Sequence, residues 1–203
     1  MPAPFMLVIA GPNGSGKTTL TNFLRRSGVD FGEYINPDDI APTLLGSYSE
    51  RVRAAQRIAD ELRDECLTNR RDFSFETVMS HPGKIEIIRR ARDAGFETTL
   101  FFIGTEAPEI NVARVGQRVA FGGHDVPDEK IIARYGRSMD LLSDAIRAAH
   151  RTFIFDNSAV GTIAAASPRL LVEIDNLDGR PRIVRGSLNG VSWASRLIQP
   201  MLG

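Results

Sequence analysis

Short apolar runs alternate along the chain with longer segments in which apolar residues recur every three or four positions. The first run, residues 6–10 (Met-Leu-Val-Ile-Ala), ends at a glycine and is typical of a strand buried on both faces of a parallel sheet. Residues 49–69 carry apolar side chains at helical spacing, which predicts a long amphipathic helix. By the same criteria we expect strands over 34–35, 73–77, 98–104 and 152–155, and helices over 17–26, 82–94, 108–119 and 128–149.

The alternation of strands and helices predicts an α/β fold with a mainly parallel central sheet and helices on both faces. Beyond residue 158 the pattern changes. Residues 170–174 and 182–184 flank an Asn-Leu-Asp-Gly turn, which predicts a small C-terminal β-hairpin. Residues 188–203 hold the only tryptophan and form either a docking helix or a tail. We expect a single domain over 1–203, with a core of about 5–158 and a hairpin and tail over 159–203.

A glycine-rich motif links the first strand to the first helix. Residues 11–18 match G-x-x-x-x-G-K-[ST] at every fixed position, in the strand–loop–helix setting that this motif requires. Its backbone N–H groups can approach phosphate oxygens, Lys17 can reach the β- and γ-phosphates, and the Thr18 hydroxyl can ligate Mg²⁺. The motif predicts a P-loop NTPase or kinase fold that uses ATP and Mg²⁺, with ATP bound by Gly11, Pro12, Asn13, Gly14, Ser15, Gly16, Lys17, Thr18 and Thr19.

Composition narrows the function classes. The chain has 42% apolar and 25% charged residues, as folded proteins do, and its 25 basic and 25 acidic residues leave no net charge. Proteins that bind nucleic acid usually have a basic excess, so we expect no nucleic-acid partner. The single cysteine, Cys66, excludes an internal disulfide and fits a small buried apolar residue. Because no apolar run is long enough to span a membrane, we expect a cytoplasmic protein without a membrane partner.

A phosphate loop is shared by motors, GTPases and kinases, so other residues must decide between them. The chain lacks the N/T-K-x-D motif that reads guanine. A kinase needs a carboxylate that orients or deprotonates the acceptor hydroxyl. Asp38 follows the second strand and is either this carboxylate or a capping or turn residue. Glu76 ends the third strand and is either a functional group or a solvated charge. Asp156 ends the fifth strand and is either a metal-binding aspartate or part of an Asp-Asn-Ser turn.

Four motifs occur in a characteristic order: the phosphate loop with the threonine after it, Ile-Asn-Pro-Asp over 35–38, Phe-Glu-Thr over 75–77, and Gly-Gly-His-Asp-Val-Pro over 122–127. Together they resemble the zeta-toxin-like P-loop kinases over about residues 5–158. The resemblance implies an ATP-dependent phosphotransferase. The best-known members of that family phosphorylate UDP-N-acetylglucosamine, a nucleotide-sugar precursor of the bacterial wall, and are held inactive by a small antitoxin. It therefore implies a nucleotide-sugar acceptor and an antitoxin, which would be a separate chain.

The resemblance also implies roles for single residues. Lys17 binds phosphate, and Asp38 is the base for the acceptor hydroxyl. Glu76 and Thr77 lie where the family contacts its acceptor. The position of His81, after the third strand and next to Pro82, gives it two interpretations that do not depend on the resemblance: it faces the same site as a further acceptor contact, or it caps the next helix.

The segment over 121–127 departs from the toxin pattern. The resemblance implies that the helix before it, which begins at Pro108, supplies an arginine, for which Arg118 is the best match. The toxins carry a second arginine just before the proline that opens the next helix, and here His124 takes that place, as in a chromosomal branch of the family. Either Arg134 or Arg137 in the following helix supplies the missing charge, or catalysis is weaker. We expect Arg118 and Arg134 to act with Lys17 and Asp38, and the glycines at 122 and 123 to form a hinge.

These features predict an ATP-dependent kinase that transfers the γ-phosphoryl group to a hydroxyl of a small acceptor, such as UDP-N-acetylglucosamine. The alternative is a regulatory NTP-binding module, or a slow ATPase, whose state a partner protein reads. The two differ in ATP consumption. A kinase consumes ATP far faster with its acceptor than without it, whereas a switch hydrolyses ATP slowly whatever small molecule is added.

Overall fold

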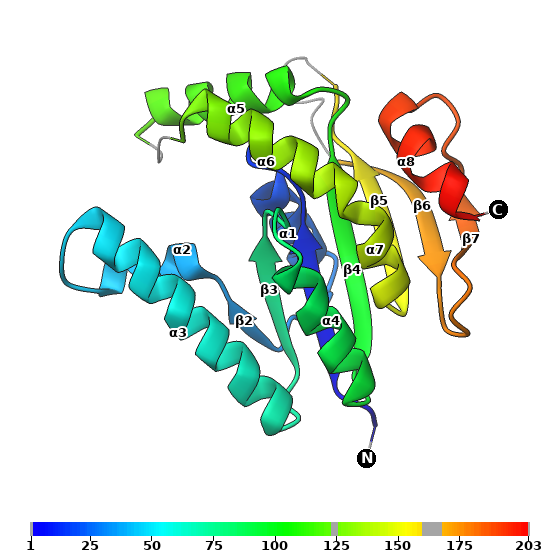
Figure 1. Cartoon of the computed structure of the whole chain (residues 1–203), viewed down its shortest axis with the longest axis horizontal. Helices are drawn as coiled ribbons and strands as arrows, with labels where there is room; N and C mark the ends of the chain where they lie inside the picture. Colours follow the sequence, from blue (N-terminus) through cyan, green and yellow to red (C-terminus); the bar gives the residue numbers. More distant parts are fainter. Residues whose placement is uncertain (1, 123–125, 160–167, 203) are drawn as a thin grey trace.

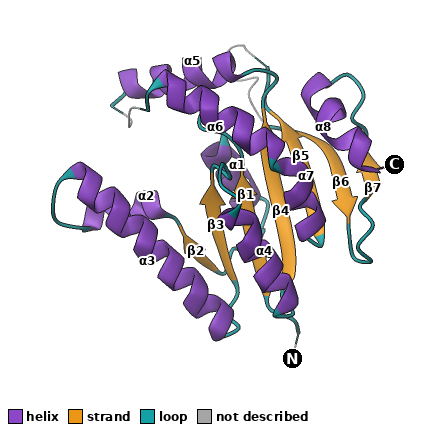
Figure 2. Cartoon of the chain, viewed as in Figure 1, coloured by secondary structure: helices purple, strands orange, loops and turns teal. Residues whose placement is uncertain are grey.

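The structure of the protein, a computed structural model, describes residues 2–122, 126–159 and 168–202 (Figure 1). Its centre is a seven-stranded sheet with the order β2-β3-β1-β4-β5-β6-β7 (Figure 2). The strands β1 to β5 pair in parallel, as the sequence predicts for most of the sheet. β6 and β7 pair antiparallel with each other, and β6 also pairs antiparallel with β5. The strands are β1 (Phe5–Ala10), β2 (Glu33–Ile35), β3 (Phe73–Thr77), β4 (Glu97–Gly104), β5 (Arg151–Asp156), β6 (Arg169–Asp175) and β7 (Arg182–Gly186).

Helices cover both faces of the sheet, but unequally. The larger apolar core lies on the face covered by α3, α4, α7 and α8. On the other face, α1 packs Leu20 and Leu24 against residues of β1 and β4 such as Ile9 and Ile103. The helices are α1 (Lys17–Arg26), α2 (Pro37–Ile40), α3 (Tyr48–Thr68), α4 (Gly83–Asp93), α5 (Pro108–Ala120), α6 (Asp128–Asp140), α7 (Leu142–Ala148) and α8 (Ser192–Leu202), with a 3₁₀ helix, η1 (Ala41–Thr43), after α2.

Local signals set where the longest helix begins. Ser47 precedes α3, and its hydroxyl accepts a hydrogen bond from the backbone N–H of Glu50 at 3.4 Å. The Glu50 carboxylate in turn accepts one from the backbone N–H of Ser47 at 2.9 Å. This reciprocal capping box satisfies two donors that would otherwise lack partners, and it starts α3 one residue before the predicted position. Cys66 on α3 is fully buried, as predicted, and burial raises the pKa of its thiol to about 11.

The prediction of a single helix over 128–149 is wrong, because two helices, α6 and α7, occupy this segment. They meet at Leu141, whose φ of −82° and ψ of −7° lie at the edge of the right-handed helical region. α6 crosses over the carboxyl ends of the strands, whereas α7 runs along the sheet near β4 and β5 (Figure 1). The apolar spacing continues through the break, since Met139 and Leu142 both enter the same core. The pattern therefore predicts helix on both sides and does not reveal the change of direction.

The C-terminal segment joins the central sheet. The predicted hairpin is confirmed: β6 pairs with β5 on one side and with β7 on the other. The last segment is a docking helix, because α8 packs on the larger core and buries Trp193 completely. None of the described helices combines the length and the apolar character that a membrane crossing would need.

Candidate active site

The phosphate loop connects β1 to α1 at the carboxyl ends of the parallel strands, beneath α5 and α6 (Figure 1). Two of its glycines permit contacts that a side chain would block. A Cβ on Gly11 would lie 2.2 Å from the carbonyl oxygen of Ile103, and one on Gly16 would lie 2.5 Å from Nδ2 of Asn157. Gly16 also has a φ of +102°, which residues with a Cβ rarely adopt. The loop therefore packs closely against the ends of β4 and β5.

Lys17 lies across its own loop and at the centre of the site's charges. Its ammonium donates to the carbonyl oxygens of Gly11 at 2.9 Å and Pro12 at 3.1 Å. The pKa of Lys17 is lowered to about 8, mainly by burial; the carboxylates Glu76 and Asp38 oppose the shift, and the cations Arg118 and Arg134 contribute to it. Charged groups from five separate segments therefore act on one another here.

The three hydroxyl residues of the loop differ in exposure. Ser15 is fully buried, and among the described residues its hydroxyl has no hydrogen-bond partner. Thr18 and Thr19 are exposed at the start of α1. A ligand above the loop can therefore reach the Thr18 hydroxyl, whereas Ser15 can contribute only through its backbone.

Asp38 and Asp39 lie exposed on the short helix α2, just past β2. The residue that caps α2 is Asn36, whose side-chain oxygen accepts from the backbone N–H of Asp38 at 3.1 Å. The capping role considered for Asp38 therefore belongs to Asn36. The Asp38 side chain remains on the surface, within electrostatic range of Lys17.

Glu76 is held by two hydroxyl groups. One carboxylate oxygen, Oε1, accepts from the Thr21 hydroxyl at 2.5 Å and from the Tyr34 hydroxyl at 2.9 Å. The guanidinium of Arg25 stacks on the Tyr34 ring, 4.3 Å from its centroid. Burial and the adjacent Glu76 carboxylate raise the pKa of Tyr34, which therefore stays a donor. Glu76 thus has a fixed position in the site and is not a solvated charge at the end of a strand.

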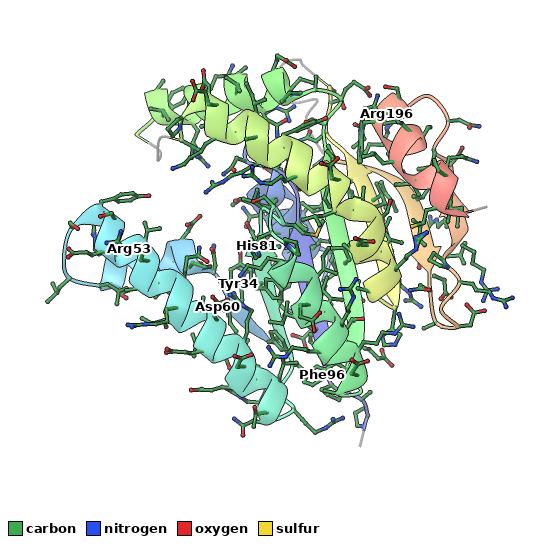
Figure 3. All side chains as sticks on the ribbon, in the orientation of Figure 1. Tyr34, Arg53, Asp60, His81, Phe96 and Arg196 are labelled. Carbon is green, nitrogen blue, oxygen red and sulfur yellow. The ribbon has the colours of Figure 1, made fainter. Side chains whose placement is uncertain are left out.

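The segment after β3 contains Thr77 and His81. The Thr77 carbonyl accepts from the backbone N–H of Gly11 at 3.2 Å, and its hydroxyl accepts from the backbone N–H of Met79 at 3.0 Å. Met79 has a φ of +53°, a strained conformation for a residue with a side chain. His81 is exposed, and its Nδ1 accepts from the backbone N–H of Gly83 at 3.1 Å, as the capping interpretation predicts. Figure 3 shows His81 toward the phosphate-loop end of the sheet and Phe96 at the opposite end.

α6 brings its two arginines to different parts of the site. Arg134 donates to the side-chain oxygen of Asn13 in the phosphate loop at 3.4 Å. Arg137, one turn later, donates to the carbonyl of Ser80 after β3 at 3.3 Å. Arg118 is exposed near the end of α5, within electrostatic range of Lys17. His124 lies outside the described residues, and Gly122, at the edge of the same loop, has a φ of +84°.

Two asparagines that the sequence analysis did not select also hold the phosphate loop. Asn111, in the first turn of α5, donates from Nδ2 to the carbonyl of Asn13 at 2.6 Å, and its own side-chain oxygen accepts from the Thr105 hydroxyl. Asn157, directly after β5, donates from Nδ2 to the carbonyl of Ser15 at 2.8 Å. Both are buried. The only signal in the sequence is their place: Asn157 directly follows a strand, and Asn111 lies in the first turn of the helix that follows another.

The Asp156 carboxylate is bound by side chains of its own turn, of α8 and of β6. Its Oδ1 accepts from the Ser158 hydroxyl and, at 3.0 Å, from the indole N–H of Trp193. Its other oxygen lies 3.7 Å from the guanidinium of Arg169. These contacts favour the turn interpretation of Asp-Asn-Ser.

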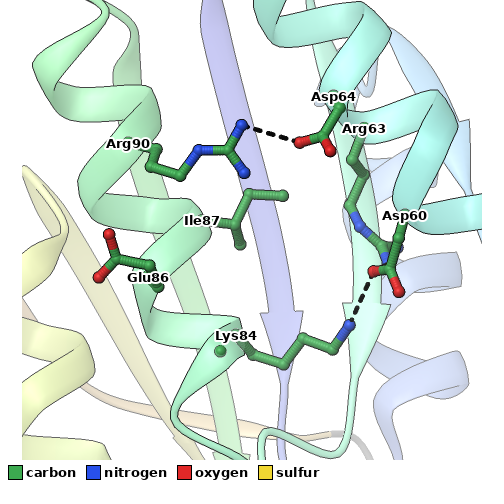
Figure 4. A pocket seen from close by; sticks show the side chains of 8 residues that line it. Asp60, Arg63, Asp64, Lys84, Glu86, Ile87 and Arg90 are labelled. Atoms are coloured by element: carbon green, nitrogen blue, oxygen red, sulfur yellow. Dashed lines mark hydrogen bonds and ion pairs between the residues drawn. The ribbon is translucent and has the colours of Figure 1, made fainter.

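A cavity of about 220 Å³ lies between α3 and α4 (Figure 4). Ion pairs cross it, Lys84 with Asp60 at 3.2 Å and Arg90 with Asp64 at 2.9 Å. Arg63, buried at its base, pairs with Asp60 and lies over the Phe75 ring. These ion pairs connect α3 to α4. Because the charges are paired with one another, the cavity offers little unpaired charge to a ligand.

A comparison with models of known protein families shows to which family the chain is related. The zeta toxin family model matches residues 1–163. The chain belongs to the zeta toxin family. A curated relative, an uncharacterized protein of Haemophilus influenzae, is 30% identical over 127 residues, which are 62% of this chain and 88% of the relative. Membership of the zeta toxin family, with the phosphate loop between β1 and α1, is the basis of the function proposed below.

Solved structures agree on the fold. The complex of AvrRxo1-ORF1 with AvrRxo1-ORF2, solved with ATP, has a TM-score of 0.66 and 14% identity and covers 98% of this chain and 64% of the matched chain. The chain thus spans just under two thirds of that protein. The PezAT chromosomal toxin–antitoxin system of Streptococcus pneumoniae has a TM-score of 0.64 and 13% identity and covers 97% and 79% of the two chains. The C-terminal segment beyond the family match is therefore included in the shared fold.

Proposed function

We propose that this zeta toxin family member transfers the γ-phosphoryl group of ATP to a hydroxyl of a small acceptor, and that the acceptor is a nucleotide sugar of the UDP-N-acetylglucosamine kind. The observation that carries the proposal is the set of charges around Lys17. Two carboxylates, Asp38 and Glu76, and two arginines, Arg118 and Arg134, all act on the lysine of the phosphate loop. A kinase needs this combination, because it must hold the phosphates and activate a hydroxyl in one place.

On the ATP side, the phosphate loop from Gly11 to Thr19 would hold the phosphates through its backbone N–H groups. Lys17 would leave the carbonyls of Gly11 and Pro12 and reach the β- and γ-phosphates. Arg134, which already contacts Asn13, and Arg118 would clamp the phosphoryl group in transfer. An arginine offers a planar fork that matches phosphate oxygens.

On the acceptor side, Asp38 would accept the proton of the acceptor hydroxyl. Its carboxylate is exposed on α2, so an acceptor can reach it without rearrangement of the core. Glu76 would receive an acceptor hydroxyl on Oε2, because Oε1 is occupied by Thr21 and Tyr34. Thr77 and His81 extend from the same strand end and would form the edge of the acceptor site.

The residues present fit Mg²⁺. Thr18 exposes its hydroxyl at the start of α1, and the described residues contain no cluster of three metal-binding side chains. Mg²⁺ usually retains several water ligands and is coordinated mainly by substrate phosphates, so it needs few protein ligands. When bound, Mg²⁺ supplies positive charge to the β- and γ-phosphate oxygens.

The PezAT system is described as a toxin and its antitoxin. We extend the proposal to a small antitoxin protein as a partner of this chain. ATP and nucleotide sugars are cytoplasmic metabolites, so the proposed reaction belongs in that compartment.

The test is a mass-spectrometric or ³¹P NMR screen of ATP and Mg²⁺ with a panel of nucleotide sugars. We expect one acceptor to gain a single phosphoryl group with wild-type protein and none with the Lys17→Ala variant. If ATP is hydrolysed slowly at the same rate with every member of the panel, the alternative of a regulatory NTP-binding module is correct. The same screen with simple sugars and nucleosides distinguishes a wrong acceptor class from the absence of transfer.

A further inference from the structure

We infer that the C-terminal helix α8 fixes the phosphate loop, and with it the affinity for ATP, through a link formed by Trp193, Asp156 and Asn157. The inference rests on the proposed ATP binding at the phosphate loop. It assigns a role to α8, which lies beyond the family match over 1–163. The three residues act as positioning residues.

The first part of the link is the tryptophan. Trp193 is fully buried, and its indole N–H donates to Oδ1 of Asp156 at 3.0 Å. A Cβ on Gly104, the last residue of β4, would lie 2.6 Å from the indole ring. The indole therefore fills the space directly over the end of β4, and only a glycine there leaves room for it.

The start of α8 is tied to two loops at once. The Ser192 hydroxyl and, at 3.4 Å, the backbone N–H of Trp193 both donate to the carboxylate of Glu106, which follows β4. The backbone N–H of Glu106 donates in turn to the Ser158 hydroxyl at 2.8 Å, and that hydroxyl donates to Asp156. These contacts hold the turn after β5 against the helix from both sides.

The last part reaches the phosphate loop. Asn157 is 7% exposed, and its backbone N–H donates to the carbonyl of Gly104 at 2.9 Å. Its side-chain Nδ2 donates to the carbonyl of Ser15 at 2.8 Å. That carbonyl belongs to the peptide joining Ser15 to Gly16, just before Lys17. A shift of the turn after β5 would leave a buried carbonyl without its partner and would loosen the loop that must hold the phosphates.

The experiment measures ATP affinity by calorimetry, together with the melting temperature, on the full chain. Trp193→Phe keeps an aromatic ring and removes the N–H, so we expect ATP binding to weaken about five- to tenfold, the effect of one lost hydrogen bond. Asp156→Asn keeps an oxygen that can accept from the indole, so we expect affinity within about twofold of wild type. A double variant, Trp193→Phe with Asn157→Ala, should bind ATP no more weakly than whichever single variant has the lower affinity. The two changes are not additive because both interrupt the same link between α8 and the phosphate loop.

Ser143→Ala is the matched control. Its hydroxyl donates to the carbonyl of Leu197 at 3.1 Å, so it fastens α8 to α7 away from the turn after β5. We expect this variant to lower the melting temperature and to leave ATP affinity unchanged. The inference is overturned if Trp193→Phe binds ATP like wild type, or if Ser143→Ala weakens binding equally. It is also overturned if Asp156→Asn loses Mg²⁺-dependent binding, since Asp156 would then act on the metal. Lys17→Ala in the same titration tests the phosphate site itself: undiminished ATP affinity there would refute the proposed function instead.

Discussion

At the scale of single residues, the balance of charge around Lys17 decides when the phosphate loop is ready for ATP. A lysine in water has a pKa near 10.5, and burial lowers that of Lys17 to about 8. Asp38 and Glu76 limit the shift, so the ammonium is still mostly protonated at neutral pH. Arg118 and Arg134 lower the pKa of Lys17, because cations gathered to bind phosphate also repel the Lys17 ammonium. Lys17 therefore changes its charge at a pH that experiments can reach.

This shift predicts the pH dependence of ATP binding. Below about pH 8 the free protein carries the Lys17 charge, and above it the charge is lost. ATP should therefore bind with constant affinity up to about pH 8 and then about tenfold more weakly for each further pH unit, until the higher pKa of the ATP complex is reached. Lys17→Arg stays charged at all these pH values and should give a flat profile. A wild-type profile that is flat up to pH 9.5 would contradict the lowered pKa.

The two hydroxyls on Glu76 lead to a second prediction. Tyr34→Phe removes a hydrogen bond to the carboxylate and keeps the ring on which Arg25 stacks. We expect phosphotransfer to fall about tenfold, with little change in ATP affinity, since hydrogen bonds to charged groups contribute about 1.5–3 kcal/mol. Thr21→Ser keeps the other hydroxyl and should behave like wild type, whereas Thr21→Val should not. Kinetics with saturating ATP and varied acceptor check this. Equal activity of the Ser and Val variants would mean that Glu76 needs no such support.

At the scale of elements, α6 joins the two sides of the site. It lies over the carboxyl ends of the strands, with Arg134 on the phosphate loop and Arg137 on the segment after β3 (Figure 1). Its N-terminus follows the glycine-containing loop, in which Gly122 adopts a positive φ. We propose that a small rotation of α6 moves both arginines together, so that the helix acts as a lid that carries its own cations.

The proposed lid, together with Arg118 at the end of α5, predicts an order among variants. Arg118→Lys and Arg134→Lys should each lower kcat by roughly 10²-fold with a smaller effect on ATP affinity, because lysine keeps the charge and loses the fork. Arg137→Lys is the matched control on the same helix, and we expect it to cost less, as we do for His124→Ala. Steady-state kinetics give the comparison. Normal turnover of both arginine variants, with an inactive His124→Ala, would show that the histidine has taken over the function of the toxin-type arginine.

The elements also show what the sequence could and could not predict. Strands β1, β2 and β4, and the helices that follow β1 and β4, begin or end at or next to a glycine or proline, whereas β3 and β5 are marked only by their apolar residues. The pattern located all of these elements within a residue or two. The break at Leu141 carries no such residue, because it results from packing α6 over the strand ends and α7 along the sheet. The phosphate loop is a contiguous motif, so the sequence predicts its strand–loop–helix setting, which the structure has between β1 and α1. Asn111 and Asn157 bond to loop residues 98 and 142 positions away, and no local pattern reports contacts of that length.

At the scale of the whole molecule, the candidate site and the C-terminal elements that pack behind it belong to one continuous sheet. The family match over 1–163 contains the phosphate loop, the two carboxylates and the lid arginines. The hairpin and α8 add the antiparallel edge of the sheet and a buried tryptophan behind the loop. This continuity favours the predicted single domain over 1–203, which stays a prediction. It also means that a truncation at the end of the family match would remove part of the core.

The most direct test of phosphoryl transfer follows the γ-phosphoryl label of ATP in wild-type protein and in Asp38→Asn, with acceptor present and ATP binding measured separately. The wild type should pass the label to the acceptor and release little inorganic phosphate. Asp38→Asn should bind ATP normally and transfer the label roughly 10²–10⁴-fold more slowly, the usual contribution of a general base. If the wild type instead releases the label only as inorganic phosphate, at a rate that no acceptor changes, the protein is a slow ATPase and not a kinase.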